Sequence, residues 1–102
     1  MSRIIEINNF DEHEAFISNN ERGIIFFGSV RCSHCRNITP VVEKLSVQYP
    51  SIRFGHVEVT EVDVENIKGV PVFVAYKMQV PIDVAIGPNA KSLATWVETK
   101  LL

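Results

Sequence analysis

The sequence is short of cysteine, of long apolar runs and of blocks of like charge. Its 102 residues contain only two cysteines, and the net charge is −2 at pH 7. No apolar run approaches the roughly 20 residues that a helix needs to cross a bilayer. The ten basic and twelve acidic side chains are interspersed, which disfavours a surface that holds nucleic acid or anionic lipid. These shortages argue against a membrane protein and a nucleic-acid-binding protein.

The N-terminus also lacks the pattern of a secretory signal. Charged side chains at Arg3 and Glu6 interrupt it, and it contains no apolar core of the kind that such signals have. We therefore expect a soluble protein of the cytoplasm. In that reducing compartment, a lone cysteine pair is better suited to redox chemistry or metal binding than to a permanent structural bridge.

The apolar content is sufficient for one core. Hydrophobic residues make up 46% of the chain, which fits a single compact domain over residues 1–102. We expect this domain to be monomeric. The apolar pattern predicts strands over residues 3–7, 24–27, 52–59, 72–76 and 80–86. It predicts helices of about ten residues ending near Asn19, over residues 38–49, over residues 61–67 and over residues 90–101.

The arrangement of these elements indicates an α/β fold. Residues 24–27 are uniformly apolar, which is typical of a central strand covered on both faces, so helices are expected on two sides. The link over residues 77–79 is too short for a parallel crossover, so the last two strands should form an antiparallel hairpin. Phe10 and Ile17, seven residues apart, are expected on the sheet-facing side of the first helix. The result is a mixed sheet of about five strands with a parallel start and an antiparallel finish.

Cys32 and Cys35 form a C-x-x-C pair where an apolar strand gives way to a helix. The start of a helix carries unpaired N–H groups and a partial positive charge, which favour thiolate over thiol. Cys32 would be the exposed nucleophile, and Cys35, one turn inside, would resolve the mixed disulfide. Arg31 and His34 add actual or potential positive charge. A more stable thiolate makes a more oxidising disulfide, so these two residues are expected to tune the pair.

Other interpretations of these residues stay open. The pair could be structural or incidental, and Arg31 and His34 could be ordinary solvent-facing residues. Zinc binding would require about four ligands, whereas the chain has no second cysteine pair and only three scattered histidines. We expect neither a metal nor an organic cofactor.

Together with features further along, the pair resembles the thioredoxin family over nearly the whole chain. Pro40 stands five residues after the second cysteine, Lys-Gly-Val-Pro-Val-Phe precedes the hairpin, and Gly87 follows the last strand. The resemblance implies the thioredoxin fold, with a central mixed sheet flanked by helices on both faces. It also implies a thiol–disulfide oxidoreductase that acts on protein substrates and is recycled by a partner reductase or oxidase.

The resemblance further implies a second wall of the site at Val70 and Pro71. It places a cis peptide bond between them, beside the cysteines, and it assigns Val70 to pairing with extended substrate backbone. An ordinary trans proline that starts an edge strand is the alternative for Pro71.

Several positions depart from the usual thioredoxin pattern. Thioredoxins usually carry tryptophan before the first cysteine and Gly-Pro between the two, where this chain has Arg31 and Ser33-His34. They also bury an aspartate that is taken to exchange a proton with the second cysteine, and Phe26 stands at that position. His56 falls near a buried lysine of the family and is a candidate proton carrier for Cys35.

These departures shape the functional expectation. A histidine before the second cysteine is more reminiscent of disulfide isomerases and oxidases, so we expect an oxidoreductase that is more oxidising or isomerase-like than typical thioredoxin. Use of glutathione is disfavoured. Glutaredoxins, which use it, usually carry Gly-Gly after the last strand, whereas in this chain Gly87 is followed by Pro88. The alternative is a non-catalytic thioredoxin-like module for binding, chaperoning or redox sensing.

Overall fold

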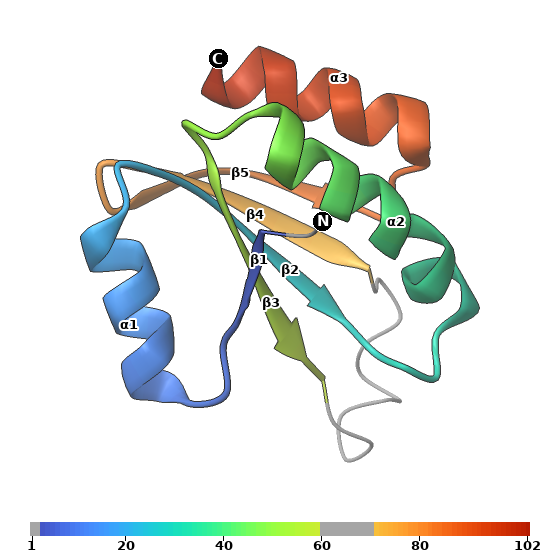
Figure 1. The fold of residues 1–102 in the computed structure, drawn as a ribbon, viewed down its shortest axis with the longest axis horizontal. Helices are drawn as coiled ribbons and strands as arrows, with labels where there is room; N and C mark the ends of the chain where they lie inside the picture. Colours follow the sequence, from blue (N-terminus) through green and yellow to red (C-terminus); the bar gives the residue numbers. More distant parts are fainter. Residues whose placement is uncertain (1–2, 60–70) are drawn as a thin grey trace.

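The computed structural model describes residues 3–59 and 71–102. Within them the elements follow one another along the chain as Figure 1 labels them. The strands are β1 (Ile4–Glu6), β2 (Arg22–Gly28), β3 (Arg53–Glu58), β4 (Val72–Lys77) and β5 (Val80–Ile86), and the helices are α1 (Phe10–Asn19), α2 (Ser33–Gln48) and α3 (Ala90–Leu101). The helix predicted over residues 61–67 and the residue Val70 lie outside the described residues.

The strands form one mixed sheet in the order β1-β3-β2-β4-β5. β1 and β2 both run parallel to β3, whereas β4 runs antiparallel to β2 and β5. The central position of β2 agrees with the uniformly apolar residues 24–27 at its centre. The predicted fold class, with a parallel start and an antiparallel hairpin, is therefore confirmed.

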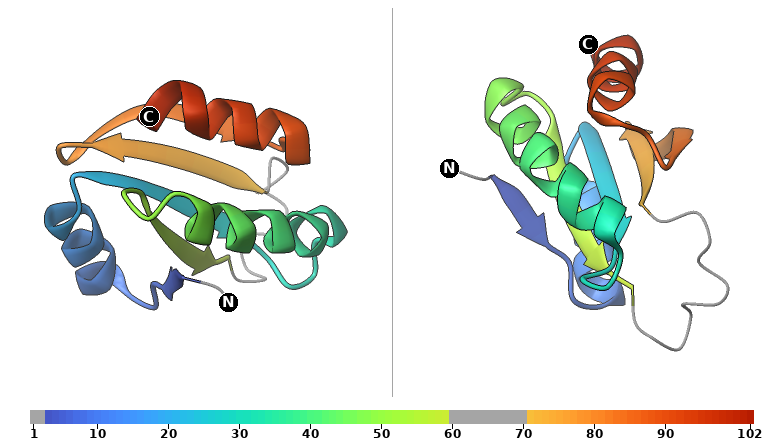
Figure 2. Two further views of the ribbon diagram at one scale, coloured as in Figure 1. Left: turned by 45° about the horizontal axis from the view of Figure 1, so that its top comes forward. Right: turned by 90° about the vertical axis from the view of Figure 1, so that its right-hand side faces the viewer.

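Helices cover both faces of this sheet, and β2 contributes side chains to the core on each face. Successive side chains of a strand point to opposite sides of the sheet. Ile24 and Phe26 belong to the core beneath α2 and α3. Ile25 belongs to a smaller core with Phe16 of α1, and Phe27 packs against it. The left panel of Figure 2 shows α1 on the opposite side of the sheet from α3. The residue pattern of one strand thus produces the layered arrangement.

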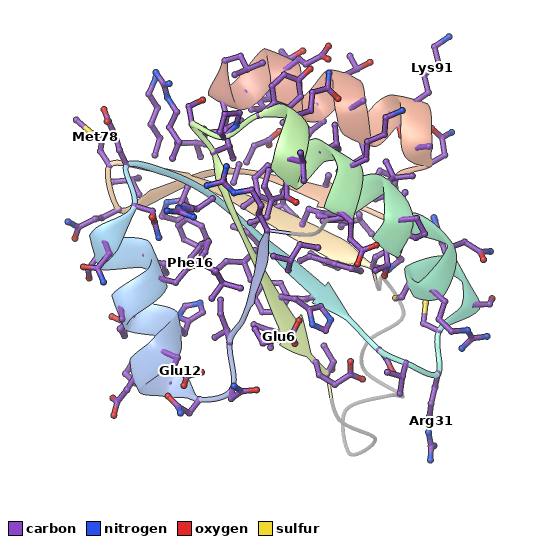
Figure 3. All side chains as sticks on the ribbon, in the orientation of Figure 1. Glu6, Glu12, Phe16, Arg31, Met78 and Lys91 are labelled. Atoms are coloured by element: carbon purple, nitrogen blue, oxygen red, sulfur yellow. The ribbon has the colours of Figure 1, made fainter. Side chains whose placement is uncertain are left out.

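α1 corrects one detail of the prediction. Phe10 was expected to face the sheet, but it is 73% exposed, and Phe16 is the buried aromatic of this helix at 5%. Phe10 is the first helical residue, next to the N-cap Asn9, and it lies outside the small core that Phe16 joins. The Phe16 ring instead lies so close to Gly23 that a Cβ there would come within 2.9 Å of it. Figure 3 shows Phe16 turned from α1 toward the strands.

The hairpin between β4 and β5 turns through Met78 and Gln79. Both have positive φ angles, 54° and 71°, which residues other than glycine rarely adopt. Two consecutive residues of this kind match the tight hairpin turns whose twist suits the flanking strands. β5 is an edge strand, which explains why it accommodates Pro81.

α2 leads away from the cysteine pair and is anchored in the core. It is continuous across Pro40 and buries Ile38, Val42 and Leu45 on one side. These are the apolar positions that the helical spacing predicted. In the part of the chain that the structure describes, no helix is both long and apolar enough to cross a membrane.

Candidate active site

Cys32 is the N-cap residue of α2, and both its backbone and its sulfur take part in the cap. Its N–H donates to the Ser29 carbonyl at 3.1 Å, and its own carbonyl accepts from the Arg36 N–H at 3.1 Å. The Cys32 Sγ accepts from the backbone N–H of Cys35 at 3.1 Å. The sulfur therefore sits where a serine or aspartate oxygen usually caps a helix. Cys32 is half-buried, and its sulfur lies at the end of α2 where the backbone N–H groups are unpaired.

Cys35 is one turn further into the helix and has a different environment. It is only 3% exposed, and both cysteines are unbridged. Burial raises the pKa of the Cys35 thiol from its ordinary 9.0 to about 11, with further increases from a hydrogen bond to Cys32 and from the charges of Cys32 and Glu58. The Ser29 backbone amide opposes the rise in pKa. At neutral pH Cys35 holds its proton, which it must lose before it can attack a disulfide.

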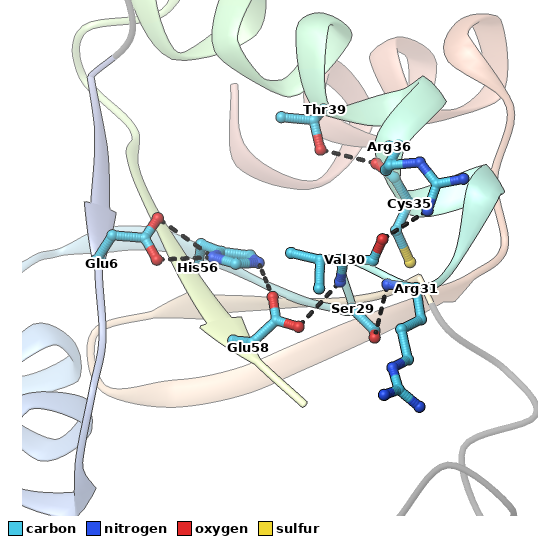
Figure 4. A network of polar contacts seen from close by, with 9 residues as sticks. All are labelled: Glu6, Ser29, Val30, Arg31, Cys35, Arg36, Thr39, His56 and Glu58. Carbon is cyan, nitrogen blue, oxygen red and sulfur yellow. Dashed lines mark hydrogen bonds and ion pairs between the residues drawn. The ribbon is translucent and has the colours of Figure 1, made fainter. Parts of the chain in front are cut away.

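The loop that leads into the pair is held at Val30 from two sides. The Glu58 carboxylate accepts from the Val30 N–H at 2.9 Å, and the Arg36 guanidinium donates to the Val30 carbonyl at 2.5 Å. The Arg31 N–H donates to the Ser29 hydroxyl at 3.2 Å. Figure 4 shows these contacts, with the Arg31 side chain directed away from the Cys35 sulfur. Figure 3 shows the same side chain reaching out from the body of the molecule.

His34 connects the start of α2 to the loop before α3. Its Nε2 lies 2.9 Å from the Pro88 carbonyl oxygen. Because a carbonyl oxygen only accepts, Nε2 carries the proton. The neighbouring Gly87 N–H donates to the Pro71 carbonyl at 2.7 Å. Two loop residues thus link the helix that carries the cysteines to the buried Pro71 at the start of β4.

His56 lies on the sheet beneath α2, beside Phe26. The two residues are direct partners in the β2–β3 register, and their rings are 5.1 Å apart. The His56 Nδ1 is 2.9 Å from a Glu6 carboxylate oxygen, and Nε2 is 3.8 Å from the Glu58 carboxylate. His56 therefore sits between two acidic side chains. Phe26 also stacks on Phe73 with ring centres 4.7 Å apart.

A cavity of about 260 Å³ lies behind the cysteine pair. It brings together Cys35, His56 and Glu58, with Phe26 and Ser29 also on its wall. The candidate proton carrier His56 and the resolving cysteine thus face one shared space. Cys32, Arg31, His34 and Pro71 do not line that cavity and lie around the helix start and its neighbouring loop.

Sequence reasoning missed several residues that build this region. Glu58 could have been found, because it follows His56 by two positions on a strand and so shares its face. Glu6 required the sheet register, which makes it the direct partner of His56. Gly28 could be recognised only from the packing, since a Cβ there would come within 2.8 Å of the Phe26 ring and 3.5 Å of the Cys35 sulfur.

Within residues 3–59 and 71–102, no group of three or more His, Cys, Asp or Glu side chains is placed to hold a metal ion.

Comparison with known proteins gives the same assignment as the geometry. The family model of thioredoxin matches residues 4–99. This chain belongs to the thioredoxin family. It is similar to thioredoxin 1 of Plasmodium falciparum, at 34% identity over 91 residues, covering 85% of this chain and 88% of the relative. It is also similar to thioredoxin-3 of Dictyostelium discoideum, at 28% identity over 105 residues, covering 99% and 100% of the two chains.

A solved structure shows the same likeness in three dimensions. The solution structure of oxidised thioredoxin from Plasmodium falciparum matches with a TM-score of 0.83 at 30% identity, covering 97% of this chain and 99% of that one. The predicted family and fold are confirmed. Thioredoxins are thiol–disulfide oxidoreductases, and the general activity of this chain is therefore thiol–disulfide exchange.

Proposed function

We propose that this thioredoxin-family protein exchanges a Cys32–Cys35 dithiol or disulfide with protein substrates. The observation that carries the proposal is the contrast within the pair. The Cys32 sulfur accepts a hydrogen bond at the helix start and is half-buried, whereas Cys35 is buried one turn inside. This is the arrangement that a two-step exchange needs, with one sulfur reachable and the other held in reserve.

The exchange requires no metal or organic cofactor, because the electrons pass between sulfur atoms. The Cys32 thiolate attacks one sulfur of the substrate disulfide, and the other substrate sulfur leaves as a thiolate. Cys35 then loses its proton and attacks the Cys32 sulfur, which forms the Cys32–Cys35 bond and releases the second substrate sulfur. The substrate is reduced by two electrons and the protein is oxidised by two. The reverse sequence oxidises a substrate dithiol.

Pro71 and Val70 are proposed to hold the substrate strand. Pro71 is buried, and its carbonyl oxygen is engaged by the Gly87 N–H. That contact fixes the chain where it enters β4, immediately after Val70. A backbone held in this way can pair with an extended substrate segment. The cis form of the bond before Pro71 stays a prediction, since it involves Val70.

Arg31 and His34 are proposed to make the pair more oxidising or isomerase-like than typical thioredoxin. Both immediately precede a cysteine, and positive charge near a helix start stabilises thiolate over disulfide. Equilibration with glutathione redox buffers would measure the reduction potential of the wild type and of Arg31→Ala and His34→Ala. We expect a wild-type potential well above that of thioredoxin, about −270 mV, and more negative values in both variants. A wild-type potential near −270 mV contradicts this part of the proposal.

The setting of the protein is also part of the proposal. We place it in the cytoplasm as a monomer that a reductase or oxidase recycles, with His56 as a proton carrier for Cys35. His56 borders the same cavity as Cys35, which supports this last role.

The direct test of the function is turnover with a protein disulfide. Insulin reduction and refolding of a scrambled protein would be followed with wild type, Cys32→Ser and Cys35→Ser. We expect exchange well above that of free dithiothreitol in wild type and none in Cys32→Ser. Wild type without such exchange would favour a non-catalytic binding, chaperone or redox-sensing module and would overturn the proposal.

A further inference from the structure

The second step of exchange needs a base that the sequence comparison does not supply. Cys35 is buried and protonated at neutral pH, so its proton must leave before its sulfur can attack. Phe26 occupies the family's carboxylate position and has no group that accepts a proton. A different acceptor must therefore be found among the residues around Cys35.

The cavity behind Cys35 connects it to a carboxylate. Its volume of about 260 Å³ is large enough for water. Glu58 borders this cavity and acts on Cys35 through its charge, and among residues 3–59 and 71–102 it is the one acidic side chain with such an effect on that thiol. The Glu58 side chain is 41% exposed, so it can also exchange protons with solvent. Glu58 thus stands between the buried thiol and bulk water.

Other contacts hold the Glu58 carboxylate in this place. One oxygen accepts from the Val30 N–H at 2.9 Å, and the other lies 3.8 Å from the His56 Nε2. His56 is in turn held by Glu6 at 2.9 Å. Figure 4 shows this series of polar contacts running from β1 across β3 to the loop before Cys32. The remaining charged groups at the cavity are Arg36 and Glu43 of α2.

We propose that Glu58 is the immediate proton acceptor for Cys35, with His56 next to it as the further proton carrier and Glu6 behind His56 as a positioning residue. In the resolving step the Cys35 proton passes to the Glu58 carboxylate through water in the cavity. The Cys35 sulfur then bonds to the Cys32 sulfur, the bond from Cys32 to the substrate breaks, and the substrate leaves as a thiolate. In the opposite direction Glu58 returns the proton. This inference rests on the proposed exchange function and assigns its proton route.

Stopped-flow reaction of the reduced protein with the aromatic disulfide DTNB separates the two steps. The first release of thionitrobenzoate reports attack by Cys32 and depends on the DTNB concentration. The second release reports resolution by Cys35 and does not. In Glu58→Gln we expect the second release to slow by about 10- to 100-fold at pH 7, with the first within about twofold of wild type.

The Glu58→Gln substitution separates proton transfer from other effects. The glutamine oxygen can still accept from the Val30 N–H, so the loop contact is kept. Loss of the Glu58 charge alone would ease deprotonation of Cys35 and speed the second release, which is the opposite sign. Added formate or imidazole should partly restore the rate in Glu58→Gln, and Glu58→Asp should keep more activity. Glu43→Gln, at the edge of the same cavity, is the matched control and should behave as wild type.

The pH dependence gives a second readout. Without a base, the second release should rise about tenfold per pH unit from pH 6 to 9, as hydroxide takes over, and wild type should rise less steeply. A tenfold rise per unit in wild type overturns the proposal without any variant. So does an unchanged or faster second release in Glu58→Gln, or equal slowing of both releases. Absence of the first release in wild type would instead overturn the proposed function.

Discussion

Cys32 and Cys35 are separated by two residues, yet they are built into the protein in different ways. Around Cys32 the contacts come from nearby backbone, namely the Ser29 carbonyl and the N–H groups of the first turn of α2. Around Cys35 they come from side chains that are distant in sequence, on β2 and β3. The Cys32 side therefore depends on local chain geometry, and the Cys35 side depends on which side chains the sheet register brings together.

This difference indicates which step of the exchange is shared with other proteins of the family and which step depends on residues of this chain. The contacts around Cys32 are made by backbone groups, so they can form in any chain with a strand followed by a helix that starts at a cysteine. The Cys32 side therefore supports the first step of exchange, which such chains share. The Cys35 side contains Phe26, His56 and Glu58, which the sheet register brings together at the cavity behind the thiol. The second step is where this protein is expected to differ from its relatives.

The most severe way to separate the two sides is to remove each sulfur in turn. Cys32→Ser should abolish exchange, because no thiolate remains at the helix start to attack. Cys35→Ser should still form the mixed disulfide but stop there, because the resolving sulfur is gone. Non-reducing gel electrophoresis with mass spectrometry would detect trapped substrate on Cys35→Ser only. Trapping on Cys32→Ser in place of Cys35→Ser would reverse the assigned roles.

Removing the Phe26 ring should damage the Cys35 side and the core together. Phe26 is 2% exposed and stacks on Phe73. Phe26→Ala should lower the free energy of unfolding by about 3–5 kcal/mol. Urea denaturation would measure the change. Phe10→Ala, which removes an aromatic ring that is 73% exposed, is the control and should cost less than about 0.5 kcal/mol. Similar losses in both would contradict the described packing.

The stability of the reduced protein should fall at high pH because of Cys35. Its pKa is raised from 9.0 to about 11 on folding. Below pH 9 this contribution is complete, and between pH 9 and 11 the unfolded chain loses the proton while the folded chain keeps it. The free energy of unfolding should therefore fall by up to about 3 kcal/mol over that range.

Comparison with Cys35→Ala isolates this contribution to the pH dependence. The pKa values of Tyr49 and Tyr76 are also raised, by a hydrogen bond to Glu98 and by burial respectively, and both tyrosines are present in the variant. The denaturation midpoint of Cys35→Ala should fall less steeply from pH 9 to 11 than that of wild type. Parallel curves would show that folding leaves the Cys35 thiol unperturbed.

Substitution of Gly87, in the loop next to His34, should have a smaller effect, which tests the backbone near the start of α2. Gly87 has a φ of +58°, and a Cβ there would lie 4.0 Å from the His34 ring, in ordinary contact. Gly87→Ala should therefore cost about 1 kcal/mol through backbone strain alone. Gln79→Gly, which relieves a positive φ at the far hairpin, should instead stabilise by about 0.5 kcal/mol. Thermal unfolding would compare the two, and a neutral Gly87→Ala would argue against the strain.

The parts that the sequence predicted are those governed by local pattern. The uniformly apolar centre of β2 indicated a covered strand, the short link to β5 indicated a hairpin, and the spacing in C-x-x-C indicated a helix start. The position of Phe10 was predicted wrongly, because periodicity gives the faces of a helix but not where the helix begins relative to the sheet. The pairing of Glu6 with His56 depends on strand register, which neighbouring residues do not encode.

The contrast between the two cysteines can be measured directly by titration of the reduced protein. Labelling both cysteines with 13C at Cβ and following their chemical shifts with pH would give one titration curve for each. The higher of the two midpoints should belong to Cys35 and lie near 11. A Cys35 midpoint at or below the ordinary thiol value of 9.0 would contradict the account, because Cys35 would then need no base for the second step.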